Sequence, residues 1–542
     1  MTPLEDLRAS VEAAAAELRN GKPAPRLRPT LERPPRADFG DYSTNAAMLL
    51  APALGAPPRQ IAEQLAEALT GRLGSRVERV EVAGPGFLNV FLAEEWFCAA
   101  LADVLAAGES YGAGTPERPE RILVEFVSAN PTGPLTAASG RHAAFGDALA
   151  RILELAGNSV EREYYFNDEG SQIRMLGESV RARARGEELP EGGYQGEYVG
   201  ELAAAIPGAA ELDADELGHP AVDLVMAGIR KTLADFRVTY DTWFLERSLH
   251  EGEPSAVQGA LERLEEHGNV YRSEGAVWLR TSALGDDKDR VLVRSTGEPT
   301  YFANDIAYHA AKLDRGHDRM INVLGADHHG YIARMKAAMA ALGVDPERLE
   351  IPILQFVHIV EGDWRASMSK RRGDFVTLDD LIRHIGVDAT RFFMLQRSHD
   401  STVDLDMDLA REQSNENPVY YVQYAHARIA SVLAKAGEER VAQALAAVAG
   451  PGALEPAERD LVKKLLAFPG EVAEAAERRA PHRIAVYALE LAQTFTAFYR
   501  DCHVVGAEPE SVESFRIALC VASRRVIACS LGLLGVSAPD SM

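Results

Sequence analysis

Four polar residues near apolar segments have the chemistry to hold a cation. Glu125 lies within the apolar stretch 122–127, and Asn130 follows that stretch. Tyr301 and Asp305 are one helical turn apart, so they share a face if their segment is helical. Carboxylates beside an amide and a phenol suit a guanidinium, whose planar donors bind carboxylates in a bidentate manner. The alternative is that each acid pairs with a structural arginine.

A second group of residues suits phosphate. The loop 368–373 reads Met-Ser-Lys-Arg-Arg-Gly, and its Lys370 is a mobile point charge of the kind that binds phosphate. Hydroxyl and backbone groups at Met368 and Ser369 suit nucleotide phosphates as well. A solvated basic loop is the alternative interpretation.

Two other stretches carry polar or aromatic residues at informative spacing. Asp327-His328-His329 has no partner cluster with metal-ligand spacing, so nucleotide contact or simple hydrogen bonding is favoured over a metal site. The stretch 417–428 mixes aromatics, amides and an arginine, the residue types that stack on and hydrogen-bond RNA bases. Some of its aromatics must nevertheless belong to the core.

The elements that would position these residues are strands of a parallel sheet. The stretch 122–157 predicts a buried strand, a Pro/Gly turn at 131–134 and a helix that Gly157 ends. A strand over 160–166 and a second over 321–324 also end in polar residues. Ligands bind at the carboxyl edge of such sheets, so we expect these polar residues to meet there.

The chain divides into three domains in this interpretation. We expect an α/β multidomain protein, its length agreeing with roughly three or four domains. The predicted parts are an N-terminal α+β domain over 1–112, a Rossmann-like parallel-sheet domain over 118–405 with an insertion at about 181–290, and a C-terminal all-α helical bundle over 406–542.

The composition excludes several classes of protein. The chain has 542 residues and a net charge of -24, which argues against indiscriminate binding to phosphate backbones but permits a local basic face. No apolar run approaches the roughly 18–20 residues of a membrane span, and the N-terminus lacks the order of a signal peptide. The four cysteines are far apart, as expected of free thiols in a reducing compartment. These features predict a cytoplasmic protein.

Together, the motifs resemble those of arginyl-tRNA synthetases almost end to end. GDYSTNAAMLLA and AGPGFLNVFL are similar to the N-terminal tRNA-binding domain of that family. VEFVSANPTGPL, YYFNDEGSQI, YFANDIAYH, GADHHGYIARM and MSKRRGDFVTLDDLI are similar to its class I catalytic domain. NPVYYVQYAHARI and LLGVSAP are similar to its helical anticodon-binding domain.

The resemblance implies ATP-dependent attachment of L-arginine to tRNA(Arg) through arginyl-adenylate, with Mg²⁺ accompanying the ATP and no dedicated protein metal site. It also implies no membrane association, and we expect a monomer. The residues implied for arginine are Glu125, Asn130, Tyr301, Asp305 and His328, and those for ATP are Gly140, Gly325, Asp327, His329, Met368, Ser369 and Lys370, with Lys370 also catalytic. The residues implied for tRNA are Asn45, Tyr420, Gln423, Tyr424 and Arg428.

One segment departs from the family pattern. Members usually carry a His-x-Gly-His motif after Pro-Leu, where this chain has Thr136-Ala137-Ala138-Ser139, so both imidazoles are absent. In one interpretation the hydroxyls of Thr136 and Ser139, the start of the following helix, and Arg141 or His142 bind the phosphates instead. In another, the protein is catalytically inert and only binds tRNA. A class I synthetase for another amino acid is the third alternative.

Overall fold

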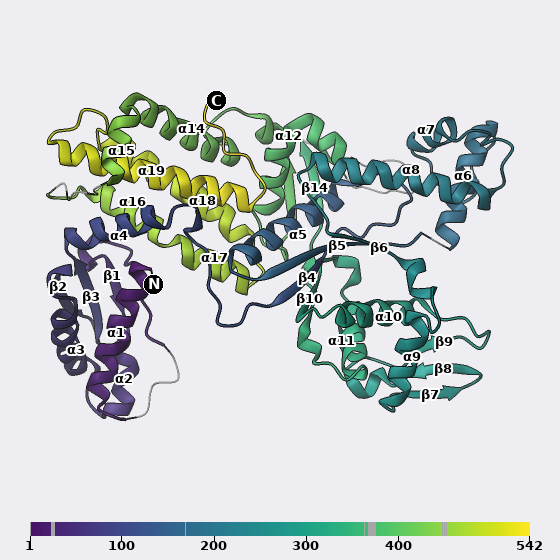
Figure 1. Ribbon diagram of the computed structural model, residues 1–542, viewed down its shortest axis with the longest axis horizontal. Helices are drawn as coiled ribbons and strands as arrows, with labels where there is room; N and C mark the ends of the chain where they lie inside the picture. Colours follow the sequence, from purple (N-terminus) through teal and green to yellow (C-terminus); the bar gives the residue numbers. More distant parts are fainter. Residues whose placement is uncertain are drawn as a thin grey trace.

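The computed structural model describes residues 2–22, 28–168, 170–362, 364–366, 376–446, 448, 450 and 452–542. Figure 1 shows a small N-terminal domain beneath a helical domain, and a central sheet from which two lobes extend on the side away from the N-terminus. The mixed α/β class, the parallel sheet and the helical C-terminal region predicted from the sequence are confirmed.

The described part of the N-terminal domain packs four helices around a three-stranded antiparallel sheet. Its elements are α1 (Pro3–Arg19), β1 (Tyr42–Thr44), α2 (Ala46–Leu54), α3 (Pro58–Leu73), β2 (Val77–Ala83), β3 (Phe87–Leu92) and α4 (Glu94–Ala107). The strand order is β1-β3-β2. Leu7, Leu65 and Val90 have no exposed surface and form part of the core between these helices and the sheet.

A five-stranded parallel sheet forms the centre of the molecule (Figure 1). Its strands are, in order across the sheet, β12 (Leu349–Glu350), β10 (Arg319–Asn322), β4 (Arg121–Glu125), β5 (Ser159–Phe166) and β6 (Thr242–Leu245). Every neighbouring pair is parallel, so the carboxyl ends share one edge. Ile122, Leu123 and Val124 are buried, as expected of a strand covered on both faces. Helix α5 (Ala137–Leu155) follows β4 and packs on the sheet.

The segment 181–290 is not one continuous insertion, because β6 lies inside it and pairs with β5. This strand has only four residues, all half-buried, and its pattern is too short to be recognised in the sequence. One lobe precedes it and one follows it (Figure 1). The first has α6 (Ser171–Arg185), α7 (Tyr198–Ala205) and α8 (Ala214–Asp235), and the second has α9 (Ala256–Glu266), β7 (Val270–Ser273), β8 (Ala276–Leu279) and β9 (Arg290–Val293).

The chain then returns to the sheet and adds two smaller sheets. The elements are α10 (Tyr301–Asp314), β11 (Leu324–Gly325), α11 (Tyr331–Ala341), β13 (Ile353–Leu354), β14 (Val357–Glu361), β15 (Trp364–Ala366), α12 (Leu378–Leu395) and β16 (Val403–Asp406). Thr377 and Asp380 form a capping box at the start of α12. Gly386, with φ 79°, ends the first part of this helix, and a second helical part follows at once.

The C-terminal domain is helical, and the part of it that the structure describes contains no strand after β16. Its helices are α13 (Met407–Arg411), α14 (Pro418–Ala436), α15 (Glu438–Ala446), α16 (Pro456–Leu466), α17 (Phe468–Glu477), α18 (His482–Asp501) and α19 (Glu510–Leu533). Helices α16 and α19 pack on α4 of the N-terminal domain. This contact joins the N-terminal domain to the C-terminal domain.

Buried ion pairs fix the domains against one another. Lys463 Nζ on α16 lies 3.2 Å from Asp41 Oδ1 in the N-terminal domain. Arg391 on α12 has no exposed surface, and its guanidinium lies 2.5 Å from Asp147 on α5. Its Nε donates to the carbonyl of Leu534 near the C-terminus at 2.7 Å. Because removing one partner of a buried pair costs about 3–5 kcal/mol, such pairs hold the domains in one arrangement.

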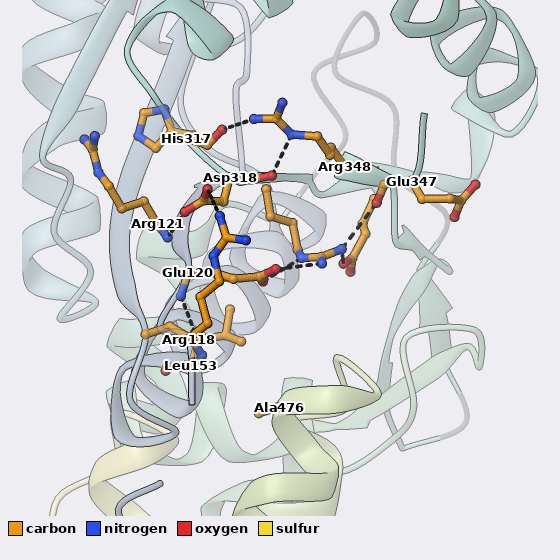
Figure 2. A network of polar contacts seen from close by, with 12 residues as sticks. Arg118, Glu120, Arg121, Leu153, His317, Asp318, Glu347, Arg348 and Ala476 are labelled. Carbon is orange, nitrogen blue, oxygen red and sulfur yellow. Dashed lines mark hydrogen bonds and ion pairs between the residues drawn. The ribbon is translucent and has the colours of Figure 1, made fainter. Parts of the chain in front are cut away.

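A further ion-pair network lies at the amino ends of the strands (Figure 2). Arg319 donates to both oxygens of Glu120 at 2.8 and 2.9 Å, and to Glu350 at 2.8 Å. Arg479, which follows α17, donates to both oxygens of Glu350 at 2.8 and 2.9 Å. These four side chains therefore tie the helical domain to β10 and β12, at the end of the sheet opposite its carboxyl edge.

Arg479→Ala is expected to lower the free energy of unfolding by about 1 kcal/mol, because it removes one bidentate member of this partly exposed network. Urea denaturation of the full chain measures the change. Arg478→Ala is the matched control, since Arg478 is exposed and its Nε lies 3.8 Å from Glu474. The control should change stability by less than about 0.5 kcal/mol. An Arg479 variant as stable as the control would contradict the role given to this network.

Candidate active site

Most of the residues predicted to hold a cation meet in one pocket at the carboxyl edge of the sheet. The pocket has a volume of about 400 Å³. It is lined by Asn130, Tyr165, Asn167, Ser171, Gln172, Glu246, Tyr301, Asp305 and His328. Asn130 Nδ2 donates to Gln172 Oε1 at 2.8 Å, which links the exit of β4 to α6. Thr300 caps α10 by accepting a hydrogen bond from Ala303 N at 3.4 Å, and this cap places Tyr301 and Asp305 on the first turns of that helix.

Glu125 ends β4 but is not among the side chains that line the pocket. Ser128 Oγ donates to its Oε1 at 2.9 Å, and Lys312 Nζ lies 2.5 Å from its Oε2. Burial by itself would raise the pKa of Glu125, but the charge and hydrogen bond of Lys312 outweigh it and keep the pKa below its ordinary value. Glu125 is therefore a buried carboxylate whose charge Lys312 balances.

The backbone that leads from β4 to the pocket is strained. Val127 has φ 69° and Ser128 has φ 40°, in the left-handed region that a β-branched residue rarely adopts. Such a conformation costs on the order of 1–3 kcal/mol per residue. Ser128 is held on both sides, because its hydroxyl donates to Glu125 and accepts from Tyr165 N at 3.2 Å. These contacts fix the turn that carries Asn130 to the pocket.

Two carboxyl groups of the pocket wall, from Asp305 and Glu246, make it acidic. Burial raises the pKa of Asp305 to about 7, and the nearby charges of Glu246 and Glu125 add to this effect, while a hydrogen bond from Tyr331 opposes it. Burial and the contact with Glu246 also raise the pKa of Tyr165 well above its ordinary value. A bound cation would stabilise the ionised form of Asp305. The pocket is therefore suited to a cation.

Glu246 was not predicted from the sequence. It follows β6 directly, and Asn304 Nδ2 donates to its Oε1 at 2.8 Å. Its side chain is 7% exposed, so it is a buried acid at a strand exit, as Glu125 is. The strand-exit pattern that identifies Asn130 would have identified Glu246 if β6 had been recognised.

The segment that departs from the family pattern forms the N-terminus of α5. Thr136 is the N-cap, since its Oγ1 accepts from Ser139 N at 3.3 Å and lies 3.2 Å from Ser139 Oγ. Gly140 is close to α12, because a Cβ on it would lie 2.8 Å from Leu378 Cδ1. The two hydroxyls are thus placed together at the positive end of a helix.

Thr136 also forms an antiparallel bridge with Thr377, which precedes α12. The described chain therefore resumes, after residues 367–375, beside the N-terminus of α5. The predicted phosphate-binding residues Met368, Ser369 and Lys370 lie outside the described residues.

The predicted nucleotide residues Gly325, Asp327 and His329 lie at the turn after β11, as does His328. Asp327, His328 and His329 are exposed, and His328 Nε2 is 3.5 Å from Asp327 Oδ2. Within the described parts of the chain, no three His, Cys, Asp or Glu side chains are grouped so as to hold a metal ion.

An exposed aromatic surface lies on α14 and α18 of the helical domain. The rings of Tyr420 and Tyr424 are stacked, with centroids 6.1 Å apart and planes 8° apart. The guanidinium of Arg428 lies 4.7 Å from the Tyr424 ring centroid and 5.3 Å from that of Tyr499. Tyr499 was not predicted, because only the packing of α18 on α14 brings it to the other three.

Two other residues predicted to bind tRNA have structural contacts. The Gln423 side chain is 7% exposed and its Nε2 donates to Asp388 Oδ2 and to the Ser537 carbonyl, both at 2.9 Å. Asn45 precedes α2, and its Oδ1 accepts from Thr30 N at 2.9 Å. Gln423 thus fastens the C-terminal segment, and Asn45 fastens the start of the first domain's sheet.

Comparison with known proteins decides the family. Sequence models described as "Arginyl tRNA synthetase N terminal domain", "tRNA synthetases class I (R), catalytic domain" and "DALR anticodon binding domain" match residues 5–92, 214–429 and 422–542. The chain is 45% identical to an arginine–tRNA ligase of Carboxydothermus hydrogenoformans, over 94% of each chain. The chain belongs to the arginyl-tRNA synthetase family.

Two further relatives agree with this assignment. An arginine–tRNA ligase of Frankia alni is 47% identical, over 95% of this chain and 94% of its own. The structure of Thermus thermophilus arginyl-tRNA synthetase superposes with a TM-score of 0.78 at 27% identity, covering 99% of this chain and all of that one. None of the helices in the described residues has the length and apolar character needed to cross a membrane.

Proposed function

We propose that this protein attaches L-arginine to tRNA(Arg) using ATP. The carboxylate of arginine attacks the α-phosphate of ATP and gives arginyl-adenylate and pyrophosphate, and the terminal ribose of the tRNA then takes the arginyl group. Mg²⁺ enters with ATP as part of the substrate. The observation that supports this function most directly is the acidic pocket at the carboxyl edge of the sheet, in a chain of this family.

In this proposal the guanidinium of arginine binds the carboxylates of Asp305 and Glu246, which share the pocket wall. Asn130, Tyr301 and His328, which line the same pocket, supply the remaining polar contacts. Glu125, whose charge Lys312 balances, can still accept further hydrogen bonds, because a carboxylate offers about four acceptor sites and two are used.

ATP would lie between the N-terminus of α5 and the turn after β11. The helix terminus with the hydroxyls of Thr136 and Ser139 attracts phosphate, and Gly140 lies in the same turn. Gly325, Asp327 and His329 lie on the adenosine side. Lys370, with Met368 and Ser369, would stabilise the charge that develops on the transferring phosphate.

The tRNA would contact the helical domain through the stacked Tyr420 and Tyr424 with Arg428, since RNA bases stack on tyrosine rings and guanidinium planes. Gln423 supports the same helical domain through its bonds to Asp388 and Ser537, whereas Asn45 supports the N-terminal domain through its bond to Thr30. Because charging of tRNA serves translation, we place the protein in the cytoplasm, and we propose that it acts as a monomer.

A second candidate function is favoured by one observation, the loss of both motif imidazoles at Thr136 and Ser139. A chain without them could bind tRNA and remain inert. Charging of a tRNA(Arg) transcript with labelled arginine tests the proposal, with lysine and citrulline as alternative substrates. Arginyl-tRNA should form. Charging with another amino acid but not arginine would overturn the assignment of the pocket.

The affinity for arginine is expected to fall as the pH is lowered. Burial first, and then the charges of Glu246 and Glu125, raise the pKa of Asp305 to about 7, so in the free protein this carboxyl is protonated below pH 7 and ionised above it. A protonated Asp305 cannot pair with a guanidinium. The KM for arginine should therefore be constant above about pH 8 and rise by roughly tenfold per pH unit well below 7. A KM that is flat between pH 6 and 8.5 would contradict this ionisation.

A further inference from the structure

The first turns of α5 carry two nitrogen-containing side chains, Arg141 and His142, that could act where the family's imidazoles are missing. Arg141 is 2% exposed. Its guanidinium donates to the carbonyls of Gln355 and Phe356 at 2.6 and 3.4 Å, and to those of Ser398 and Ser401 at 2.9 and 2.8 Å. All of these contacts are with the backbone of neighbouring loops. Arg141 therefore has a structural role and is not available to a phosphate.

His142 lies in a different environment. It is one helical turn beyond Ser139, so the two side chains share a face of α5. Its ring is beside the turn after β11, because a Cβ built on Gly325 would lie 3.7 Å from His142 Cε1 and 3.8 Å from its Nε2. The same Cβ would lie 2.8 Å from Asp327 Oδ1. The imidazole thus closes the space between the start of α5 and the nucleotide residues Gly325 and Asp327.

The imidazole of His142 has no hydrogen bond among the described residues. The residue is only partly buried, so part of its surface is open. Burial, assisted by the positive charge of Arg141, lowers the pKa of His142 to about 4. The ring is therefore neutral at physiological pH and offers one donor and one acceptor.

We propose that His142 hydrogen-bonds the nucleotide bound between α5 and the Gly325–His328 turn, and so replaces the imidazoles absent at Thr136 and Ser139. The inference rests on the proposed function, since it assumes that ATP occupies this space. Two features support it: the ring lies beside the predicted nucleotide turn, and its nitrogens form no hydrogen bond within the described residues. The helix N-terminus and its two hydroxyls then need only one imidazole, that of His142 in the next helical turn, to complete the binding of the nucleotide.

The test compares His142→Ala and His142→Gln with the wild-type chain in ATP–pyrophosphate exchange, with arginine and tRNA(Arg) present. Loss of one neutral hydrogen bond should raise the KM for ATP by roughly tenfold in His142→Ala and leave the KM for arginine within twofold. His142→Gln keeps a donor and an acceptor and should lose less. His399→Ala is the matched control, because it removes another imidazole near α5, 5.8 Å from the Phe145 ring, outside the pocket.

The outcomes separate the inference from the function on which it rests. Exchange by the wild type with an unchanged KM for ATP in both variants would overturn the role of His142 alone. Equal increases in the KM values for ATP and arginine would also overturn it, because they indicate a general structural effect. If His142→Ala does not fold, His142→Gln decides by the same criterion. No exchange by the wild type would refute the proposed function itself.

Discussion

Asp305→Asn is expected to lower kcat/KM for arginine by roughly 30- to 5,000-fold. Removing one partner of a buried, hydrogen-bonded charge pair costs about 2–5 kcal/mol, and the arginine guanidinium would lose such a partner. The neutral amide keeps the size of the side chain, so the fold should be little affected. Asp305 is half-buried in the pocket beside the buried Glu246, which is why the effect should be large. Steady-state exchange kinetics with varied arginine measure it.

Asp314→Asn provides the matched control for this variant. Asp314 ends the same helix, α10, but its side chain is 73% exposed and lies 3.6 Å from Arg263, so its loss should change kcat/KM by less than twofold. The KM for ATP should not change in either variant. If Asp305→Asn used arginine as well as Asp314→Asn does, the guanidinium would not bind where we place it.

Lys312→Met is expected to destabilise the protein by about 3–5 kcal/mol, because it leaves the Glu125 carboxylate buried without its cation. Lys312 has no exposed surface, and its Nζ also donates to Asn322 Oδ1 at 3.0 Å and lies 4.1 Å from the Tyr308 ring centroid. Methionine matches the shape of the lysine stem but brings no charge. Chemical denaturation of the full chain at pH 7.5 measures the loss.

The double variant Glu125→Gln with Lys312→Met separates charge from packing. It removes both charges of the pair and leaves neither one buried without its partner, so most of the lost stability should return. A single Lys312→Met variant as stable as the wild type would show that the buried Glu125 carboxylate does not depend on the charge of Lys312 for its stability. A double variant as unstable as the single one would assign the loss to packing instead.

Much of the site could be predicted because a parallel sheet gathers strand exits at one edge. Asn130 follows a strand with an unbroken apolar run, and Tyr301 and Asp305 have helical spacing, so residues far apart in the chain could be placed in one pocket before the fold was known. The capping box of α12 is also encoded locally in the sequence, since Thr377 and Asp380 contact each other across one turn.

The rest depended on contacts that no local pattern encodes. Glu246 follows a four-residue strand that pairs at the sheet edge, and Lys312 reaches Glu125 from a helix 187 positions along the chain. From the sequence alone, either Arg141 or His142 could take over phosphate binding from the missing imidazoles. Only the packing of loops 355–356 and 398–401 on α5 shows that Arg141 is satisfied by carbonyls, whereas the His142 ring lies beside Gly325.

The most direct test of the account is arginine-dependent ATP–pyrophosphate exchange by the full chain, measured with and without tRNA(Arg). The family assignment and the acidic pocket predict exchange that requires arginine and rises when tRNA(Arg) is added, despite Thr136 and Ser139 in place of the two imidazoles. Binding of tRNA(Arg) without exchange above background would contradict the account and leave a protein that only binds tRNA.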